Sequence, residues 1–284
     1  MSYFRPTILE DALDWLSTHD ARIVAGSTDL FTGTDRQTLK GHILDITAIG
    51  ELQELIQTDK GWSIGAATTW SDIISSDLPS AFDGLKLAAR EVGSIQIQNA
   101  GTVVGNICNA SPAADGIPCL LSLDSSVELL SVRGRRSVPL ESFITGPRKT
   151  NIASDEIVTR IVAPQDSCQG SSHFLKLGAR KYLIISIAMV ATRLLIENGV
   201  ITQAAISVGA CTPVAVRLRE AETALAGKPA TPSSIASISD QMIQNALLPI
   251  DDVRATGEYR SIAATELVRR SLNRLVAKSL EAAA

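Results

Sequence analysis

The chain has 284 residues, and at roughly 100–200 residues per domain this length favours two domains. Lys and Arg number 26 against 30 Asp and Glu, a net charge of −4 without a run of five like charges, which argues against an electrostatic nucleic-acid binder. The most apolar segment, residues 182–191, is far shorter than the roughly 20 residues of a membrane-spanning helix, and the N-terminus lacks an apolar signal core, so we expect a cytoplasmic protein without a membrane span.

The first half of the chain is expected to alternate between short strands and helices. Residues Thr7-Ile8-Leu9-Glu10 read as a capping box, and apolar residues at helical spacing behind it predict a first helix. Thr69 can cap a further helix. Strands are predicted over residues 22–25, 42–46, 62–67, 126–132 and 156–162, and a helix over residues 80–91. Residues 93–118 hold four glycines, three asparagines and two prolines, which disfavours long regular structure.

The second half is predicted to hold a hairpin sheet and helices. Residues 164–172 have few apolar groups and are the best candidate for a linker. Asn198-Gly199 between two apolar runs is the strongest short hairpin signal, and it predicts strands over residues 188–196 and 200–209. Helical patterns over residues 214–225, 233–247 and 261–280 complete the chain.

Two glycine-bearing segments suit a phosphate or a nucleotide-like cofactor. Residues 23–30, Ile-Val-Ala-Gly-Ser-Thr-Asp-Leu, predict a strand that stops at a glycine, so that N–H and O–H donors converge and backbone can approach a phosphate. Residues 99–115 mix glycines, polar tips and apolar side chains in a way that fits a large flat cofactor with a polar tail. The alternatives are an ordinary turn and a structural loop of about 15 residues, although such long loops are uncommon in compact domains.

Two cationic positions are weaker candidates. In residues 146–150, Gly-Pro-Arg-Lys-Thr, adjacent cations follow a turn and could approach a phosphate, but solvated surface cations are commoner. Lys176 stands between two leucines and could reach a cleft, although a lysine on the wet face of a sheet is the commoner case.

The four cysteines show no metal-ligand spacing. Cys108, Cys119, Cys168 and Cys211 are scattered, no C-x-x-C pair occurs, and the chain has only three histidines. Redox chemistry would therefore need an organic cofactor or a partner.

Together, the two glycine-bearing segments, the Gly-Pro-Arg-Lys-Thr segment and residues 251–260 resemble the FAD-binding medium subunit of the molybdenum hydroxylases. That family includes the flavin subunits of xanthine dehydrogenases, carbon monoxide dehydrogenases and aromatic hydroxylases. The resemblance covers essentially the whole chain. It implies an α+β fold with a PCMH-type FAD-binding domain of two α/β subdomains, residues 1–165, and a C-terminal domain, residues 172–284, with a three-stranded antiparallel sheet and three helices.

The resemblance also implies a cofactor site. FAD would bind non-covalently, with its pyrophosphate on residues 25–29 and 102–106, Asp115 on its ribose or adenosine side and Lys176 near the flavin ring. No residue of this chain is expected to act as a general acid or base or to bind a metal. The implied cofactor-binding residues are Val24, Ala25, Gly26, Ser27, Thr28, Asp29, Leu30, Thr102, Val103, Val104, Gly105, Asn106, Cys108, Asp115, Val158 and Lys176.

The sequence departs from the family pattern at three places. The family usually has Gly-Gly where this chain has Val104-Gly105, and a valine would be strained if that position required a positive φ. It usually has a second glycine where this chain has Ser27. Residues 182–185, Tyr-Leu-Ile-Ile, replace the polar residue that the family carries after the Arg-Lys pair.

The resemblance implies an electron-transfer role. A molybdopterin-binding large subunit would hydroxylate the substrate, a small subunit with two 2Fe-2S clusters would relay the electrons, and FAD on this chain would pass them to NAD+ or another acceptor, in a dimer of heterotrimers. The rival hypothesis is a scaffold or assembly subunit that keeps the fold without functional flavin. A stand-alone flavin oxidase would need its own substrate pocket with a base, and the sequence offers none.

Overall fold

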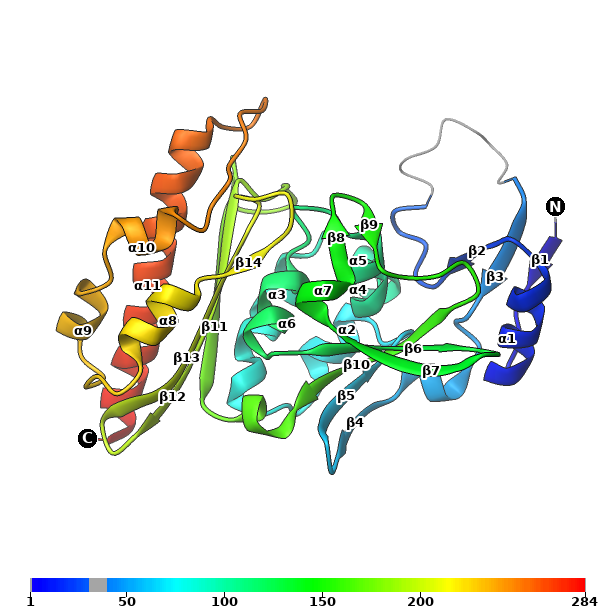
Figure 1. Ribbon diagram of the computed structural model, residues 1–284, viewed down its shortest axis with the longest axis horizontal. Coiled ribbons are helices and arrows are strands. Elements are labelled where there is room, and N and C mark those ends of the chain that lie inside the picture. The colour runs from blue at the N-terminus through cyan, green and yellow to red at the C-terminus, as the bar shows by residue number, and fades with distance from the viewer. Residues whose placement is uncertain (1, 31–39, 284) are drawn as a thin grey trace.

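Three larger β-sheets follow one another along the computed structural model, which describes residues 2–30 and 40–283 (Figure 1). The N-terminal sheet lies at the right of the view and the C-terminal sheet with its helices at the left. Their strand orders are β1-β3-β2, β4-β5-β10-β6-β7 and β11-β12-β13-β14. The chain thus passes through three sheet-containing units in sequence.

The first sheet is parallel and is covered by one helix. It consists of β1 (Ser2–Phe4), β2 (Ala21–Val24) and β3 (His42–Asp45), with α1 (Leu9–Thr18) between the first two strands. The predicted helix is confirmed, and its buried face consists of Leu9, Ala12, Leu13 and Leu16. The predicted capping box over residues 7–10 is wrong, because the helix begins one residue later, with Ile8 at its N-cap and no side-chain cap bond. The acidic Glu10 and Asp11 instead lie in the first turn, where the helix dipole favours negative charge.

The second sheet is antiparallel, and its middle strands were predictable. Its strands are β4 (Leu55–Thr58), β5 (Gly61–Gly65), β6 (Ser126–Ser131), β7 (Gly134–Pro139) and β10 (Ile157–Pro164). The two edge strands, β4 and β7, were not predicted, because they are largely polar or exposed. The elements around this sheet are η1 (Gly50–Gln53), α2 (Trp70–Ser75), η2 (Ser80–Phe82), α3 (Asp83–Glu91), α7 (Leu140–Phe143) and the small hairpin of β8 (Ile144–Gly146) and β9 (Lys149–Thr150). Thr69 caps α2 as predicted, in a capping box with Asp72.

Residues 93–118 form three short helices instead of one long loop. They are α4 (Ile95–Ala100), α5 (Val103–Asn109) and the first part of α6 (Gly116–Ser122). The alternative of a structural loop of about 15 residues over 99–115 is therefore wrong, whereas the prediction that this region lacks long regular structure is confirmed, because its helices have only six or seven residues. Thr102 caps α5, which buries Val103, Val104 and Ile107 against the core. Val104 has no positive φ, so the valine is unstrained there.

The C-terminal sheet has four strands, not the three implied by the resemblance. Its strands are β11 (Ser171–Leu177), β12 (Ala188–Glu197), β13 (Val200–Gly209) and the two-residue β14 (Val216–Arg217). The predicted hairpin is confirmed, because Asn198 and Gly199 both have positive φ, 52° and 75°, as a two-residue turn requires. β14 takes the start of the predicted helix over 214–225, which begins only at Arg219.

Four helices, not three, follow this sheet within the described residues. They are α8 (Arg219–Leu225), α9 (Pro232–Ala236), α10 (Asp240–Gln244) and α11 (Gly257–Ala283). The helix predicted over 233–247 is divided because Ser239 caps a new helix after α9 has ended. The helical periodicity of residues 233–247 therefore did not reveal the boundary between α9, which ends at Ala236, and α10, which begins at Asp240.

Strand β12 is shared by two hydrophobic cores, which explains its nearly continuous burial. Met189 and Ala191 belong to the core that the first two sheets also line, while Ala188, Val190 and Leu194 belong to the core under the C-terminal helices. Side chains alternate between the faces of a strand, so one strand serves both cores. The C-terminal sheet is therefore an interior layer that packs against both cores.

Residues 164–172 are packed and are not the loose linker that their composition suggested. They form the end of β10, the 3-10 helix η3 (Gln165–Cys168) and the start of β11. Ser167 and Cys168 are buried, and the Ser172 hydroxyl accepts a hydrogen bond of 2.7 Å from the Gly84 N–H. Polar contacts hold residues 164–172 in place, whereas the prediction of a linker was based on their few apolar side chains.

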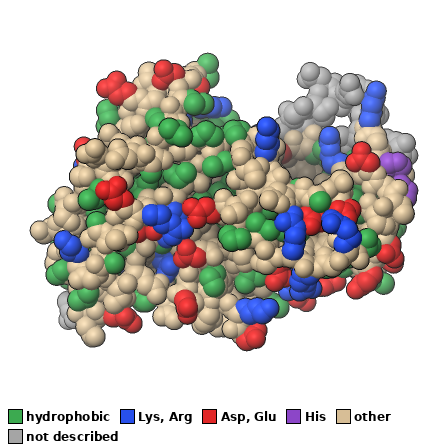
Figure 2. Space-filling view, in the orientation of Figure 1, with side chains coloured by type: hydrophobic (Ala, Val, Ile, Leu, Met, Phe, Trp, Pro, Cys, Tyr) green, Lys and Arg blue, Asp and Glu red, His purple; other side chains and the backbone are tan. Residues whose placement is uncertain are grey.

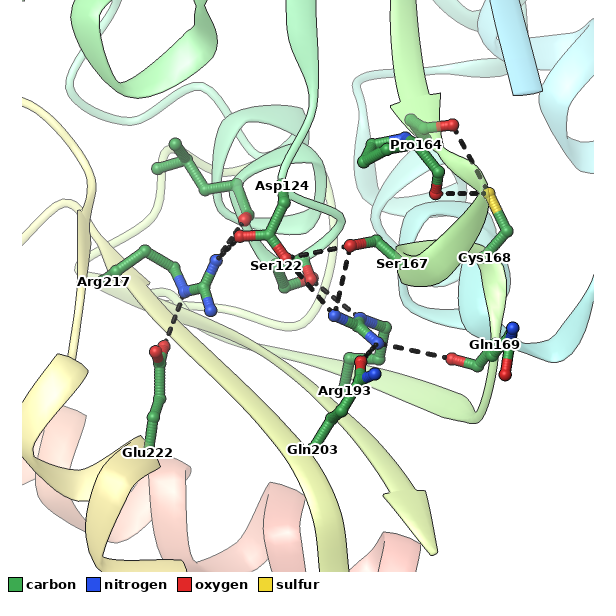
Figure 3. Close-up of polar contacts among 12 residues, drawn as sticks. Ser122, Asp124, Pro164, Ser167, Cys168, Gln169, Arg193, Gln203, Arg217 and Glu222 are labelled. Atoms are coloured by element: carbon green, nitrogen blue, oxygen red, sulfur yellow. Dashed lines mark hydrogen bonds and ion pairs between the residues drawn. The ribbon is translucent and has the colours of Figure 1, made fainter. Parts of the chain in front are cut away.

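Ion pairs of two buried arginines join the two halves (Figure 3). Asp124 follows α6 and accepts bonds from Arg217 at 2.7 Å, from Arg193 at 3.3 Å and from the Ser167 hydroxyl at 2.9 Å. Arg217 also contacts Glu222 at 2.5 Å. Burial raises the pKa of Asp124, but the two guanidinium groups and the hydroxyl outweigh it and lower that pKa overall. The junction is thus a network of two buried guanidinium groups around a carboxylate that stays partly exposed.

Candidate functional site

The first segment makes a sharp turn directly after β2. Ser27 has φ of 57°, a left-handed conformation that favours glycine, and this is the position where the related family usually carries one. The Leu30 N–H returns to the Ser27 carbonyl at 3.2 Å and closes the turn. Ser27 therefore adopts the left-handed backbone conformation that a glycine would adopt at this position.

Gly26 is required by the second segment. A Cβ atom built on Gly26 would lie 1.9 Å from the carbonyl oxygen of Ala100. We expected this glycine to let backbone approach a phosphate, but the close approach seen here is to protein backbone. Gly26 is thus needed for the close packing of the two predicted segments, because a side chain at this position would overlap the Ala100 carbonyl.

Three of the predicted segments meet in one chain of hydrogen bonds. The Asn109 side-chain amide donates to the carboxylate of Asp29, and the Arg148 guanidinium donates to the side-chain oxygen of Asn109. The Arg148 N–H also donates to the Ala110 carbonyl at 2.8 Å. Arg148 therefore bonds within the protein, linking the β8–β9 turn to the other two segments. Lys149 is exposed.

A buried side-chain oxygen in the second of these segments forms no hydrogen bond with the described residues. The side-chain oxygen of Asn106, on α5, is buried, and none of the described residues forms a hydrogen bond with it. It lies 3.1 Å from the position that a Cβ atom on Gly116 would take. Leaving a buried acceptor unpaired costs roughly 1–3 kcal/mol. A ligand that donates a hydrogen bond at this point would remove that cost.

Asp115 and Lys176 form a buried ion pair. The Lys176 Nζ lies 2.5 Å from one carboxylate oxygen of Asp115, and the Ser186 hydroxyl donates to the other at 2.6 Å. Both charged side chains are more than nine-tenths buried. Burial raises the pKa of the Asp115 carboxyl, and Lys176 and Ser186 oppose this shift without cancelling it. The commoner alternative for Lys176, a solvated cation, is therefore wrong.

A cavity adjoins the lysine on the α3 side of β11. Its volume is about 390 Å³. The lining combines apolar side chains, among them Leu87 and Phe174, with the cationic Lys176, Arg180 and Lys181. Such a mixture of apolar walls and a few charges is typical of small-molecule sites.

Three other implied residues lie in different surroundings. Cys108 is exposed on α5, Val158 is buried in β10 opposite Leu129, and Val24 is buried at the end of β2. Val158 belongs to the core of the second sheet, and no hydrogen bond ties it to the cluster formed by the segments. Ser186 was missed as a site residue, although a lone serine interrupting the most apolar segment was the signal that could have found it.

Neither a metal site with three or more protein ligands nor a membrane helix is found in the described part of the chain. Within residues 2–30 and 40–283, no three His, Cys, Asp or Glu side chains gather as ligands would. No helix in those ranges combines the length and the apolar character needed to cross a membrane.

Comparisons with known proteins agree over nearly the whole chain. The family model of the FAD binding domain in molybdopterin dehydrogenase matches residues 1–166, and that of the CO dehydrogenase flavoprotein C-terminal domain matches residues 173–275. The chain is 30% identical over 282 residues to the xanthine dehydrogenase FAD-binding subunit of Escherichia coli O157:H7, covering 97% of this chain and 96% of that one. It is 33% identical over 238 residues to the nicotinate dehydrogenase FAD-subunit of Eubacterium barkeri, covering 81% and 80%.

The structural comparison confirms the expected α+β fold. A chain of the carbon monoxide dehydrogenase from Hydrogenophaga pseudoflava superposes with a TM-score of 0.89 at 27% identity, covering 98% of this chain and 97% of that one. The corrections to the C-terminal sheet and helices leave this fold class unchanged.

Proposed function

Because the chain belongs to the family of FAD-binding subunits of the molybdenum hydroxylases, we propose that it carries FAD as the electron outlet of such an oxidoreductase. In this proposal, electrons reach the chain from 2Fe-2S clusters on a small partner subunit, after substrate hydroxylation on a molybdopterin-binding large subunit. NAD+ or another acceptor takes them up. When bound, FAD supplies the redox chemistry, and the protein supplies position and electrostatics.

The unpartnered oxygen of Asn106 is the observation that carries the proposal. It is a buried acceptor, and the turn at Ser27 lies in the neighbouring segment. Hydroxyl and N–H groups of a dinucleotide are donors that such an oxygen accepts. The residues present thus fit the cofactor that the family carries.

The division of labour among the segments follows from their contacts. The turn at residues 25–29 is proposed to hold the phosphates through its backbone N–H groups. The start of α5 is proposed to lie along them, although the N–H groups of Val103, Gly105 and Asn106 already donate to Thr68 and Thr102. Lys176 is proposed to lie near the ring, and Asp115, whose two carboxylate oxygens bond to Lys176 and Ser186, is proposed to fix its ammonium group instead of binding the ribose or adenosine side that the resemblance implied. Arg148 is proposed to position Asp29 without contacting FAD itself, because Arg148 donates to Asn109 and Asn109 donates to Asp29.

The scaffold alternative rested on two departures from the family pattern, and one of them carries no strain in the structure. It drew on Val104, which replaces a family glycine, and on the polar residue missing after Lys181. Val104 is an ordinary buried helical residue, whereas Tyr182, Leu183 and Ile185 are exposed apolar side chains at the second place.

The test is FAD affinity in a variant that leaves the fold intact. Because the Asn106 side-chain oxygen bonds to no described residue, Asn106→Ala should keep the melting temperature and weaken FAD binding roughly 3- to 10-fold, the equivalent of one hydrogen bond. Asn273→Ala, on the exposed side of α11, is the matched control. A folded wild-type chain that takes up no FAD would refute the proposal.

A further inference from the structure

Two of the three histidines of the chain meet at one edge of the N-terminal sheet. His42 opens β3, and in the parallel register it lies beside Ser2, which opens β1, and Ala21, which opens β2. His19 directly follows the last residue of α1. The carboxyl end of the helix and the amino ends of three parallel strands therefore bring the two imidazole rings together, with their centres 4.9 Å apart.

Each of these rings is held through one nitrogen and leaves the other nitrogen free. The Nδ1 atom of His19 lies 2.9 Å from the Trp15 carbonyl oxygen and 2.9 Å from the Thr18 hydroxyl oxygen. A carbonyl only accepts, so the first bond requires the proton on Nδ1, and the neutral ring then has its lone pair on Nε2. The Nδ1 atom of His42 lies 2.6 Å from the Ser2 hydroxyl oxygen. No residue that the structure describes bonds to either Nε2 atom.

An aromatic side chain fixes the two rings from one side. Trp15 stacks on His19, with ring centres 4.5 Å apart and 13° between the planes, and it meets His42 edge-on at 5.9 Å. Both histidines are only half-buried. Figure 2 shows histidine side chains at the surface of the right-hand lobe, where the N-terminal sheet lies in Figure 1. The rings are thus held in place and remain accessible to a ligand from solvent.

We infer that His19 and His42 together bind one divalent transition-metal ion, of the class of Zn²⁺, Ni²⁺ and Cu²⁺, through their Nε2 atoms. These ions prefer imidazole nitrogen. Two imidazoles on one Zn²⁺, each at roughly 2.0–2.1 Å, have ring centres about 5 Å apart in tetrahedral geometry, which agrees with the 4.9 Å between these rings. Water completes the coordination, because no set of three His, Cys, Asp or Glu ligands forms among the described residues.

Two features of the surroundings favour a cation at this point. The bond that each Nδ1 makes is the contact by which proteins orient a histidine whose other nitrogen binds a metal. Helix α1 also ends here without a basic residue in its last turn, so the partial negative charge of its carbonyl end is free to attract an ion.

The metal site is separate from the candidate cofactor site. Strand β2 runs from Ala21 at the histidine edge to Val24, after which the turn at residues 25–29 begins. At roughly 3.3 Å per residue the two edges lie about 10 Å apart. A bound ion would tie the end of α1 to the start of β3 and so stabilise the sheet that carries the turn. The inference goes beyond the proposed function and does not depend on it.

The test is Zn²⁺ binding to the full chain, measured by calorimetry after dialysis against a chelator. We expect one Zn²⁺ per chain with micromolar affinity. His19→Gln and His42→Gln should each weaken binding at least about tenfold, because each removes one of two protein ligands. His173→Gln is the matched control at the third histidine, whose ring lies 3.4 Å from the Ser271 hydroxyl, and it should bind as the wild type does. Mg²⁺, which prefers oxygen ligands, should not compete.

Trp15 supplies a second readout at the site itself. Cu²⁺ bound beside His19 should quench the fluorescence of the stacked Trp15, and excess Zn²⁺ should reverse the quenching. Trp15→Phe should remove this quenching. The melting temperature of each variant without metal separates the loss of a ligand from the loss of the fold, and if a histidine variant fails to fold, the quenching of the wild type and its reversal decide.

Three results would overturn the inference. The first is a wild-type chain that binds no Zn²⁺ at millimolar concentration and shows no quenching by Cu²⁺. The second is unchanged affinity in a folded His19→Gln or His42→Gln chain, because one ion would then not be shared by the two rings. The third is loss of binding in His173→Gln alone, which would place the ion elsewhere.

Discussion

Replacing Lys176 by methionine isolates the energy of the buried pair at the candidate site. The ammonium group lies 2.5 Å from the Asp115 carboxylate, and both side chains are more than nine-tenths buried. Removing one partner of such a pair costs about 3–5 kcal/mol, because a charge is left buried and uncompensated. The Ser186 hydroxyl remains on Asp115, so we expect the lower end, about 3 kcal/mol.

The assay is urea unfolding of the FAD-free chain in a double-mutant cycle. Lys176→Met combined with Asp115→Asn removes both charges, and about 2 kcal/mol of the loss should return, because no unpaired ion stays buried. Purely additive effects, with a cost below about 1 kcal/mol for Lys176→Met, would refute the buried pair.

The same variant should show a distinctive pH dependence. Burial raises the pKa of Asp115 above its ordinary value of 3.8, and Lys176 is the largest opposing influence, so Lys176→Met should raise it further. A carboxyl whose pKa is higher in the folded chain binds protons more tightly there, so stability falls as pH rises through that range. The deficit of Lys176→Met should therefore shrink on acidification towards pH 4 and grow towards neutrality, and a deficit independent of pH would contradict this reasoning.

Two further stability predictions follow from close contacts. Gly26→Ala should destabilise the chain by about 3 kcal/mol or more, because the new Cβ would lie 1.9 Å from the Ala100 carbonyl oxygen. Ser27→Gly should change the stability by less than about 1 kcal/mol, because φ of Ser27 is already 57°. Equal urea midpoints for the two variants would contradict the close packing of the two segments. Arg217→Met should cost about 3–5 kcal/mol in the same assay, because the buried Glu222 loses a cation 2.5 Å away, and a loss below about 1 kcal/mol would show that the junction is open to water.

The predictability of the fold followed the strength of local signals. Helix α1, the capped α2 and the Asn198-Gly199 hairpin were predicted because spacing, capping and turn chemistry act over a few residues. The edge strands β4 and β7 carry no such signal, since only their hydrogen-bonded neighbours make them strands. The prediction of a linker over residues 164–172 was wrong for the same reason, because Ser167 is buried by contacts with residues distant in sequence, such as Asp124.

The candidate site was predictable as a set of segments but not as a set of contacts. Glycines and hydroxyl groups marked residues 23–30 and 99–115, and both lie in the cluster. Which side chains pair was beyond local signals, because Asn109 meets Arg148 and Asp115 meets Ser186 only through the tertiary fold. The role of Gly26 shows the limit most clearly, because a glycine next to a ligand and one next to protein backbone look alike in a sequence.

Flavin reduction in the assembled complex is the most direct test of the electron-outlet role. The chain is reconstituted with the two subunits that the proposed function requires. Xanthine, nicotinate and carbon monoxide are offered in turn, and the visible flavin band is followed by stopped flow. With the substrate that the complex oxidises, the band should bleach in the complex and stay unchanged in the isolated chain. Bleaching in the isolated chain, or full turnover by the complex while its flavin stays oxidised, would contradict the proposed role.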